Sequence, residues 1–245
     1  MREYSRKAMV AGLSCMLACA AMAGGAAGAE VRKIGWFEPV EKEVEGWKVY
    51  VDPAMLEGEH REEGQRALKM LANHLQRIAI LIPEKPLADL RKVGIWIEHS
   101  HPELNSMQYH PGKKWLIGKG YDPRLVKKVH VPQARRLLSR QQLLKHPAVI
   151  LHELAHAYHD QVLGFDDPSI LKAYKEAMAA GSYEKVMLFD GRMGRHYAAT
   201  DHQEYCAEAT EALLYRNAFY PFVAGELKVH DPGAHAVVSR IWGGS

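Results

Sequence analysis

The chain has 245 residues, of which 47% are hydrophobic and 25% are charged, and its formal net charge is +3. This composition excludes a disordered or low-complexity protein and predicts one folded domain with a sizeable core. So small a net charge also provides no global field that would select nucleic acid or a membrane surface.

The first 29 residues have the pattern of a secretory leader. Arg2, Arg6 and Lys7 precede an uncharged run over residues 8–22, and small residues end in Ala-Gly-Ala at 27–29. The apolar run is short and rich in Ala and Gly, which is more typical of a signal peptide than of a stable membrane span. We therefore expect export to the periplasm or the extracellular space. A retained signal anchor and lipid attachment at Cys19 are the alternatives.

Removal of this leader would change both the charge and the cysteine content. Three basic residues and one acidic residue leave with it, so 29 positive and 28 negative residues remain. Cys15 and Cys19 also leave, and Cys206 alone cannot form an intramolecular disulfide. The exported domain must then depend on its core, and on any bound metal, for stability.

After the leader, the hydrophobic periodicity predicts strands first and helices later. Strands are expected at 47–52, 93–98, 115–118 and 128–131, with a helix at 62–80 between the first two. Helices are expected at about 145–162, 168–180, 201–217 and 233–242, where Asp167, Thr200 or Asp201, and Asp231 or Pro232 provide start signals. This order predicts a single α+β domain over residues 31–245, with a small mixed sheet and a helical C-terminal half. Residues 31–60 could form a pro-segment, but the strand pattern favours a part of the fold.

The strongest chemical signal is His152-Glu153-Leu154-Ala155-His156, inside an apolar run without a helix breaker until Gly164. On a helix, positions i and i+4 lie about 40° apart, so His152 and His156 can reach one ion. Imidazoles suit Zn²⁺, which acidifies a water molecule when one coordination position stays open. Glu153 is the expected general base. The alternatives are packed or solvated histidines and a purely structural metal site.

A third ligand is expected from the helix at 201–217. There, Glu204, Glu208 and Glu211 form one acidic stripe, and spacing alone does not choose among them. A solvated helix face is the alternative for each, and we favour it for Glu211. His159 lies two turns from His152, too far to share the ion, and is interpreted as a neighbour of the site or a solvated residue. Cys206 lies about 200° around the helix from Glu204, so it is expected in the core.

The motif at 152–156 and the segment Glu204-Tyr205-Cys206-Ala207-Glu208 resemble the lethal-factor-like, gluzincin-type zinc metallopeptidases. The resemblance spans roughly residues 125–245 and is dense only at 147–222. It implies a zincin-like fold, Glu204 as the third zinc ligand and Glu208 as a carboxylate behind the ligands or a structural residue. Cys206 departs from the family, which usually has an aromatic residue there.

The same resemblance places a tyrosine seven residues before the third ligand, at Tyr197. A phenol near the metal can donate a hydrogen bond to the oxyanion of a tetrahedral intermediate, so Tyr197 is the candidate for this role. An aromatic residue that only packs at the approach to the helix is the alternative. Neighbouring His196 could share or replace the role.

Ten basic residues and one acid lie between Lys113 and Lys145. A basic cleft rim would favour acidic peptides, although a solvated basic face without a preferred partner is the simpler interpretation. The strand region 128–133 is placed to line the cleft and pair with an extended substrate. No aromatic platform accompanies the charge, so we expect no nucleic-acid partner.

Together these features predict a secreted zinc metallopeptidase that cleaves peptide bonds in a peptide or protein substrate. One rival is an exported binding or regulatory module that kept zinc with weak or lost activity, against which the intact Glu153 argues. The other rival is a zinc hydrolase of a non-peptide amide or a cell-wall crosslink. The sequence does not indicate the oligomeric state.

Overall fold

The computed structural model describes residues 33–243. The predicted leader, with Cys15 and Cys19, lies outside the described residues. Over the described residues, no helix is both long and apolar enough to cross a membrane. The domain is α+β with a small mixed sheet, as the order of the predicted elements indicated.

The described residues form two β-sheets and nine α-helices. The strands are β1 (Val40–Val44), β2 (Trp47–Val51), β3 (Ile95–Ile97), β4 (Gln108–Tyr109), β5 (Val129–Val131), β6 (Val186–Met187) and β7 (Met193–Gly194). The helices are α1 (Arg61–Leu81), α2 (Glu84–Leu90), α3 (Lys113–Lys119), α4 (Arg140–Lys145), α5 (Val149–Tyr158), α6 (Pro168–Ala180), α7 (His202–Leu214), α8 (Ala224–His230) and α9 (Pro232–Trp242).

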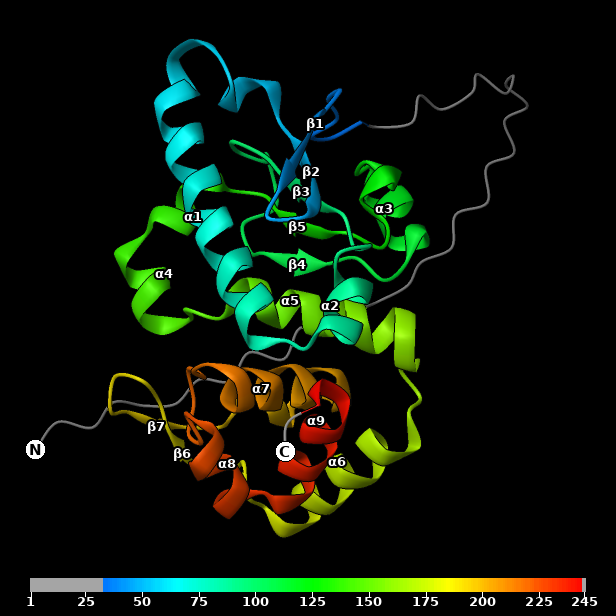
Figure 1. Ribbon diagram of the computed structural model, residues 1–245, viewed down its shortest axis with the longest axis vertical. Helices are drawn as coiled ribbons and strands as arrows, with labels where there is room; N and C mark the ends of the chain where they lie inside the picture. The colour runs from blue at the N-terminus through cyan, green and yellow to red at the C-terminus, as the bar shows by residue number, and fades with distance from the viewer. Residues whose placement is uncertain (1–32, 244–245) are drawn as a thin grey trace, which may run out of the picture. The chain divides into compact units, whose positions relative to one another are not determined.

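The main sheet has the order β1-β2-β3-β5-β4. The central strands β2, β3 and β5 are parallel, whereas β1 and β4 run antiparallel to their neighbours at the two edges. In Figure 1, α5 lies between this sheet and α7, so the sequence motif at 152–156 is held between the two halves of the domain.

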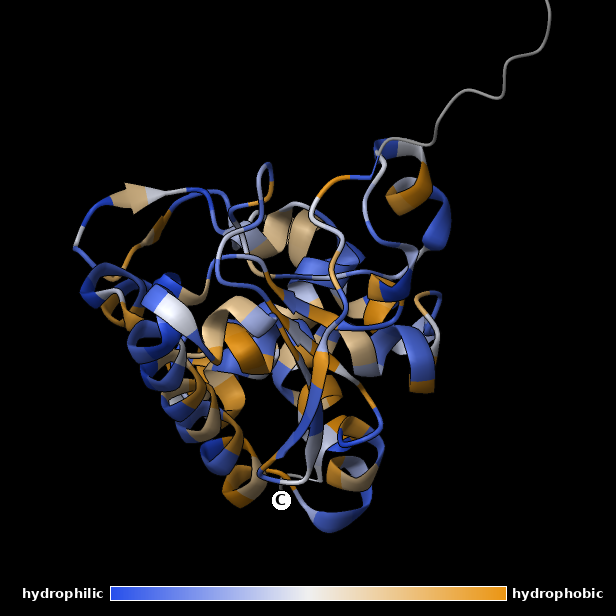
Figure 2. Ribbon diagram, turned by 90° about the horizontal axis from the view of Figure 1, so that it is seen from above, coloured by the Kyte–Doolittle hydropathy of each residue, from blue (hydrophilic) through white to orange (hydrophobic). Residues whose placement is uncertain are grey.

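The two faces of the sheet contact different surroundings because successive strand residues point to opposite sides. Val49, Ile95 and Val129 belong to the main core, which they share with α1 and α5. Trp96 points to the other face, where a smaller cluster includes Leu116 of α3. Figure 2 shows hydrophobic residues along the central strands, with hydrophilic and hydrophobic residues alternating along the surrounding helices.

A group of four polar side chains is enclosed on this second face, and we call it the closed cluster: Glu98, His101, His110 and His130. All four are buried. His130 Nε2 lies 2.9 Å from Glu98 Oε1, and His130 Nδ1 lies 3.1 Å from His110 Nε2. Burial raises the pKa of Glu98 to about 8 and lowers the pKa of His130 to about 3, so the pair is neutral at pH 7.

Three aspartates are the N-caps of helices in the C-terminal half, as the start signals predicted. Asp167 accepts hydrogen bonds from the backbone N–H groups of Ser169 and Ile170, and Asp231 caps α9 through Ala234. Asp201 does the same for α7. Such caps satisfy backbone donors that a first helical turn leaves free.

One expected strand is wrong, and one expected helix begins later than predicted. Residues 115–118 lie in α3 rather than in a strand, because a short apolar run between glycines fits either element and only Leu116 is buried here. The helix expected at about 145–162 is confirmed, but it begins at Val149, after a bend in which His146 precedes Pro147 and leaves the helical region. After α5, residues 159–163 continue as a π-helix.

Candidate metal centre and pocket

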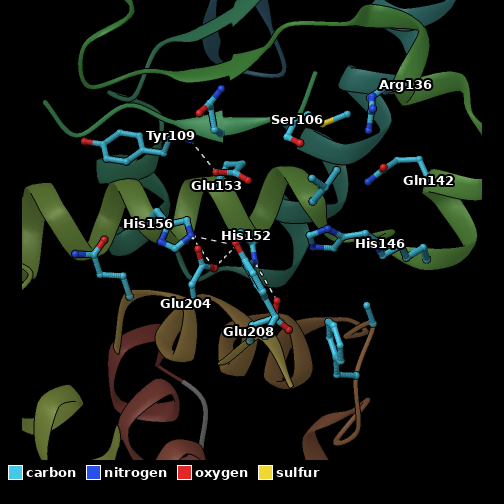
Figure 3. A pocket seen from close by; sticks show the side chains of 18 of the residues that line it. Ser106, Tyr109, Arg136, Gln142, His146, His152, Glu153, His156, Glu204 and Glu208 are labelled. Carbon is cyan, nitrogen blue, oxygen red and sulfur yellow. Dashed lines mark hydrogen bonds and ion pairs between the residues drawn. The ribbon is translucent and has the colours of Figure 1, made fainter. Parts of the chain in front are cut away.

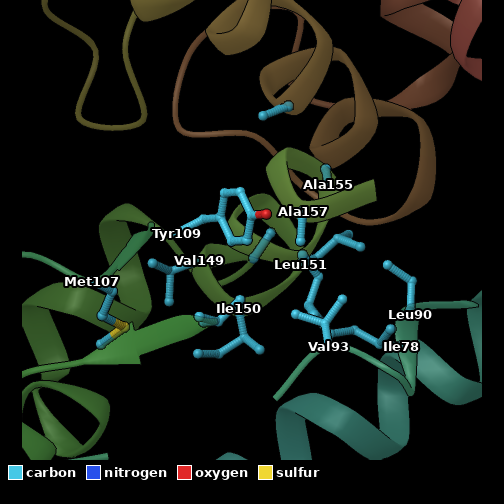
Figure 4. Close-up of a cluster of buried hydrophobic side chains, with 14 of the residues drawn as sticks. Ile78, Leu90, Val93, Met107, Tyr109, Val149, Ile150, Leu151, Ala155 and Ala157 are labelled. Atoms are coloured by element: carbon cyan, nitrogen blue, oxygen red, sulfur yellow. The ribbon is translucent and has the colours of Figure 1, made fainter. Parts of the chain in front are cut away.

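Helix α5 is buried on nearly every side, and its hydrophobic residues explain its position. Ile150 and Leu151 contact the core formed with α1 and the sheet, as Figure 4 shows around Ile78 and Val93. His152 and Glu153 are also buried, at 3% and 7% exposure. Because buried polar groups are costly without partners, the surroundings of these two side chains decide what the site can do.

The two histidines of the motif converge as the helical spacing predicted. His152 Nε2 and His156 Nε2 lie 3.1 Å apart, and their rings are nearly perpendicular. Two nitrogens at this separation can share one ion or one proton.

Glu204 reaches the same point from the first turn of α7. Its backbone N–H donates to Asp201 Oδ1 at 2.9 Å. The residue that caps α7 therefore also fixes the backbone position of Glu204. Glu204 Oε2 lies 3.1 Å from His152 Nε2 and 3.4 Å from His156 Nε2. The structure therefore brings together the three residues predicted as metal ligands (Figure 3).

The spacing of these three atoms matches the donor geometry that zinc requires. Tetrahedral Zn²⁺ has bonds of about 2.0–2.1 Å to imidazole and carboxylate donors, which places its ligand atoms about 3.3 Å apart. The three distances here are 3.1, 3.1 and 3.4 Å. Two imidazoles and a carboxylate are also a ligand set of catalytic zinc sites. The residues present thus fit this ion without rearrangement.

The electrostatics of the three groups favour a positive charge between them. Burial alone would lower the pKa of His152, but hydrogen bonds to Glu204 and Glu211 raise it well above its ordinary value. Burial alone would raise the pKa of Glu204, but hydrogen bonds to His152 and His156 hold it well below its ordinary value. Either a proton or a metal ion supplies such a charge.

Glu211 contacts His152, and the solvated face we favoured for it is wrong. Its side chain has 0% exposure, and Oε1 lies 2.6 Å from His152 Nδ1 and 2.8 Å from His146 Nε2. A carboxylate on Nδ1 fixes the tautomer of His152 so that Nε2 is free to bind a metal. Glu208 and Glu211 of the acidic stripe are buried, and Glu204 is partly buried, because α7 packs directly on α5.

His146 is a site residue that the sequence analysis missed. It lies in the bend before Pro147, lines the pocket beside the metal centre and forms a second group of potential donors with His152 and Glu211. Its position six residues before His152 is not a ligand spacing on a continuous helix, so only the break between α4 and α5 brings it close.

Glu208 lies behind the proposed ligands. Its Oε1 is 3.9 Å from His152 Nδ1, and its Oε2 is 3.8 Å from His196 Nδ1. Burial next to Glu211 raises the pKa of Glu208. Glu208 therefore contributes to the buried polar surroundings without reaching the Nε2 atoms.

Glu153 points from α5 toward the edge of the sheet. The backbone N–H of Tyr109 in β4 donates to Glu153 Oε2 at 2.8 Å, and burial raises the pKa of the Glu153 carboxyl. The strand that lines the cleft is therefore β4. The expectation that residues 128–133 do so is wrong, because β5 lies between β3 and β4 inside the sheet. Two strand residues are too few for a recognisable sequence pattern.

A pocket of about 540 Å³ opens beside the three converging atoms. Its walls come from the β4 segment, from residues 136–149 and from the beginning of α7. Tyr197 lines this pocket with 48% of its surface exposed, and burial together with Glu204 raises the pKa of its phenol. His196 is buried instead, accepts the Ala198 N–H through Nδ1 and stacks on Phe219. Of the two alternatives for the oxyanion role, only Tyr197 borders the pocket.

Two other singled-out residues lie away from the pocket. Cys206 is a free thiol at 3% exposure in the main core, as its position on the helix predicted. His159 is buried against His202 and Phe165 in the π-helix, and its ring does not join the three converging atoms.

No protein-family model, no curated protein and no solved structure matches this chain. The residues and their geometry are therefore the whole basis for assigning chemistry to the site.

Proposed function

We propose that this protein is a zinc metallopeptidase with a zincin-like fold of the lethal-factor-like, gluzincin type. The observation that carries the proposal is the convergence of His152 Nε2, His156 Nε2 and Glu204 Oε2 at 3.1–3.4 Å beside a pocket that Glu153 also lines. The leader expected over residues 1–29 would direct the enzyme out of the cytoplasm.

In this proposal, His152, His156 and Glu204 hold the ion and leave one side open to the pocket. A Zn²⁺ ion bound there supplies a Lewis acid that acidifies water and polarises a substrate carbonyl. Glu211 holds the His152 ring in place through Nδ1. The chain thereby provides both the ligands and the group that orients one of them.

Glu153 acts as the general base. Its carboxylate accepts the proton of the attacking water and passes that proton to the leaving amine nitrogen. Burial raises the pKa of Glu153, which brings its proton affinity closer to what transfer to an amine requires. The Tyr109 N–H fixes one carboxylate oxygen, Oε2, and leaves the other, Oε1, to handle the proton.

Tyr197 is proposed to donate its phenol hydrogen to the developing oxyanion. A phenol whose pKa lies above its ordinary value is protonated at neutral pH, as a donor must be. Extended peptide substrates are favoured over other amides because β4 is an edge strand along the pocket, and an edge strand can add a further strand through its backbone.

The test is to measure metal content by mass spectrometry and cleavage of a mixed peptide library, using the mature protein. Wild type is compared with Glu153→Gln, Glu204→Ala and Tyr197→Phe, and with Glu176→Ala as the control. Glu176 is an exposed helical glutamate of α6, paired only with Lys172. We expect one zinc ion and cleavage in wild type and in the control.

Each variant has its own expected outcome. Glu153→Gln should keep zinc and lose about 10²–10⁴-fold in kcat, and Glu204→Ala should lose the metal. Tyr197→Phe should keep zinc and lower kcat. Zinc binding without cleavage of any peptide would favour the binding-module rival, and cleavage of isolated peptidoglycan alone would favour the cell-wall rival. Absence of zinc in wild type would refute the assignment of His152 and His156.

A further inference from the structure

The pocket beside the metal centre is asymmetric in charge. Arg136 and Lys145 line it near His146, whereas the wall beyond His156 carries the uncharged Phe165 and Gln203. Within residues 33–243, the acidic side chains that line this pocket are Glu153, Glu204 and Glu208, all near the proposed catalytic centre. One end of the pocket is therefore suited to an anionic group.

Arg136 and Lys145 differ in their partners from two other basic residues of the same segment, Arg124 and Lys127. Arg124 pairs with Asp122 and Glu38, and Lys127 pairs with Asp160. Over the described residues, neither Arg136 nor Lys145 forms an ion pair with a carboxylate. Two cations that face the same pocket repel each other. An anion bound between them attracts both and offsets this repulsion.

The backbone near Arg136 is held by buried neighbours, and the backbone near Lys145 is held by a hydrogen bond at the surface. Arg136 lies in a short 3₁₀ helix, Ala134–Leu138, whose Ala134 and Leu137 are buried. Lys145 ends α4, where the Arg216 guanidinium donates to the Leu144 carbonyl at 2.5 Å. The two side chains therefore start from fixed positions even though their ends are exposed.

The direction of β4 shows which part of a substrate would meet this basic end. In Figure 3, Ser106 lies beside Arg136 and Gln142, whereas Tyr109 lies at the opposite end. The chain thus runs from the basic end toward Tyr109. A peptide that pairs antiparallel with β4 runs the other way, and it places the residues after its scissile bond beside Arg136 and Lys145.

We propose that Arg136 and Lys145 form a subsite for a carboxylate on the C-terminal side of the scissile bond. The carboxylate belongs either to an Asp or Glu side chain or to the C-terminus of the substrate. This inference rests on the proposed function. Of the basic residues between Lys113 and Lys145, it names two, Arg136 and Lys145, as determinants of substrate specificity.

The experiment uses peptide hydroxamates, because a hydroxamate binds zinc while the attached peptide extends along the C-terminal side. One series carries Glu at the first, second or third position and ends in an amide. A second series carries Gln at the same positions, and a third carries Gln and ends in a free carboxylate. Affinities are measured by calorimetry on zinc-loaded wild type, on Arg136→Gln/Lys145→Gln and on Arg135→Gln/Arg140→Gln.

The last of these variants is a matched control, since Arg135 and Arg140 are exposed neighbours that do not line the pocket. In wild type, we expect a Glu probe or the free-carboxylate probe to bind about tenfold more tightly than its neutral counterpart. The series that binds more tightly than its neutral counterpart identifies the source of the carboxylate. The preference should vanish in Arg136→Gln/Lys145→Gln and persist in the control, with affinity for neutral probes unchanged in both.

Equal affinity of wild type for charged and neutral probes would overturn the subsite, as would a preference that survives in Arg136→Gln/Lys145→Gln. Failure of the proposed function has a different signature, because neutral hydroxamates then show no zinc-dependent binding to wild type at all.

Discussion

The domain contains two histidine groups with the same internal spacing and opposite surroundings. We call the first the open cluster: His146, His152, His156, Glu204 and Glu211. In it, two ring nitrogens lie 3.1 Å apart, and the same distance separates His110 Nε2 from His130 Nδ1 in the closed cluster. The distance between two imidazoles therefore does not identify a metal site.

The carboxylates and the access to solvent distinguish the two clusters. His152 of the open cluster contacts both Glu204 and Glu211, and the pKa of His152 is raised well above its ordinary value. Over residues 33–243, His130 of the closed cluster contacts one carboxylate, Glu98, besides its contact with His110, and burial lowers the pKa of His130 to about 3. The open cluster borders a pocket, whereas all members of the closed cluster are buried. Two carboxylates around one histidine, one of them buried and the other partly buried, favour a cation, and a single carboxyl favours a neutral hydrogen-bonded chain.

The largest expected effect separates the two clusters by their response to zinc. Zinc at about 1,000 times its dissociation constant should raise the free energy of unfolding of wild type by about 4 kcal/mol. His156→Ala should abolish this gain, since it removes a ligand. His110→Ala should retain it, even if the variant starts from a lower stability. Urea denaturation with zinc and with a chelator measures both. A zinc gain lost in His110→Ala alone would reverse the assignment of the two clusters.

A smaller effect concerns the ionisation of Glu98. Its pKa is raised by burial to about 8 in the fold, against about 4.5 in the unfolded chain, so the folded state binds the proton more tightly. The resulting stability is complete below pH 4.5 and is lost as the pH rises toward 8. Glu98→Gln cannot ionise and lacks this dependence. Between pH 5 and 7, wild type should lose about 2 kcal/mol relative to that variant.

Urea denaturation at both pH values measures the Glu98 effect. Glu57→Gln, at an exposed carboxyl, is the control and should follow wild type. Parallel pH profiles of wild type and Glu98→Gln would show that the closed cluster is charged, and the contrast between the two clusters would then fail.

The smallest effect sharpens the role of Glu211 within the open cluster. Glu211→Gln keeps an oxygen that can accept the His152 Nδ1–H but removes the charge that makes the ring a better ligand. Zinc affinity should fall about tenfold, as for other residues that orient metal ligands. Competition with a chromogenic chelator measures this affinity. Glu208→Gln should change it less, because Glu208 lies 3.9 Å from the same nitrogen. The reverse order would make Glu208 the orienting carboxylate.

Sequence patterns predicted the open cluster better than its surroundings because its core follows from one helical repeat. His152 and His156 lie one turn apart, and an aspartate cap marks where the helix of Glu204 begins. The contribution of Glu211 was missed because a glutamate stripe is the same on a solvated helix and on a buried one. Only the packing of α7 on α5 decides between them.

The closed cluster had no sequence signal at all. Its members are spread from Glu98 to His130 and are brought together by β3, β4 and β5, whose longest segment is three residues. Strands this short carry too few alternations for a reliable pattern. β4 was not predicted for the same reason, so the strand at the cleft was wrongly assigned to residues 128–133.

The hydrogen bond from the Tyr109 N–H to Glu153 has a consequence for how a substrate can be aligned. His110 pairs through its N–H with Lys128 and through its carbonyl with Lys127, just before β5, so the outward backbone groups of this edge belong to Met107 and Tyr109. One of these groups, the Tyr109 N–H, is already bound to Glu153, the proposed catalytic base. A peptide that slipped by two residues to capture it would withdraw a hydrogen bond from Glu153. The edge strand therefore discriminates between registers, and a misaligned peptide meets a base that has lost its anchor.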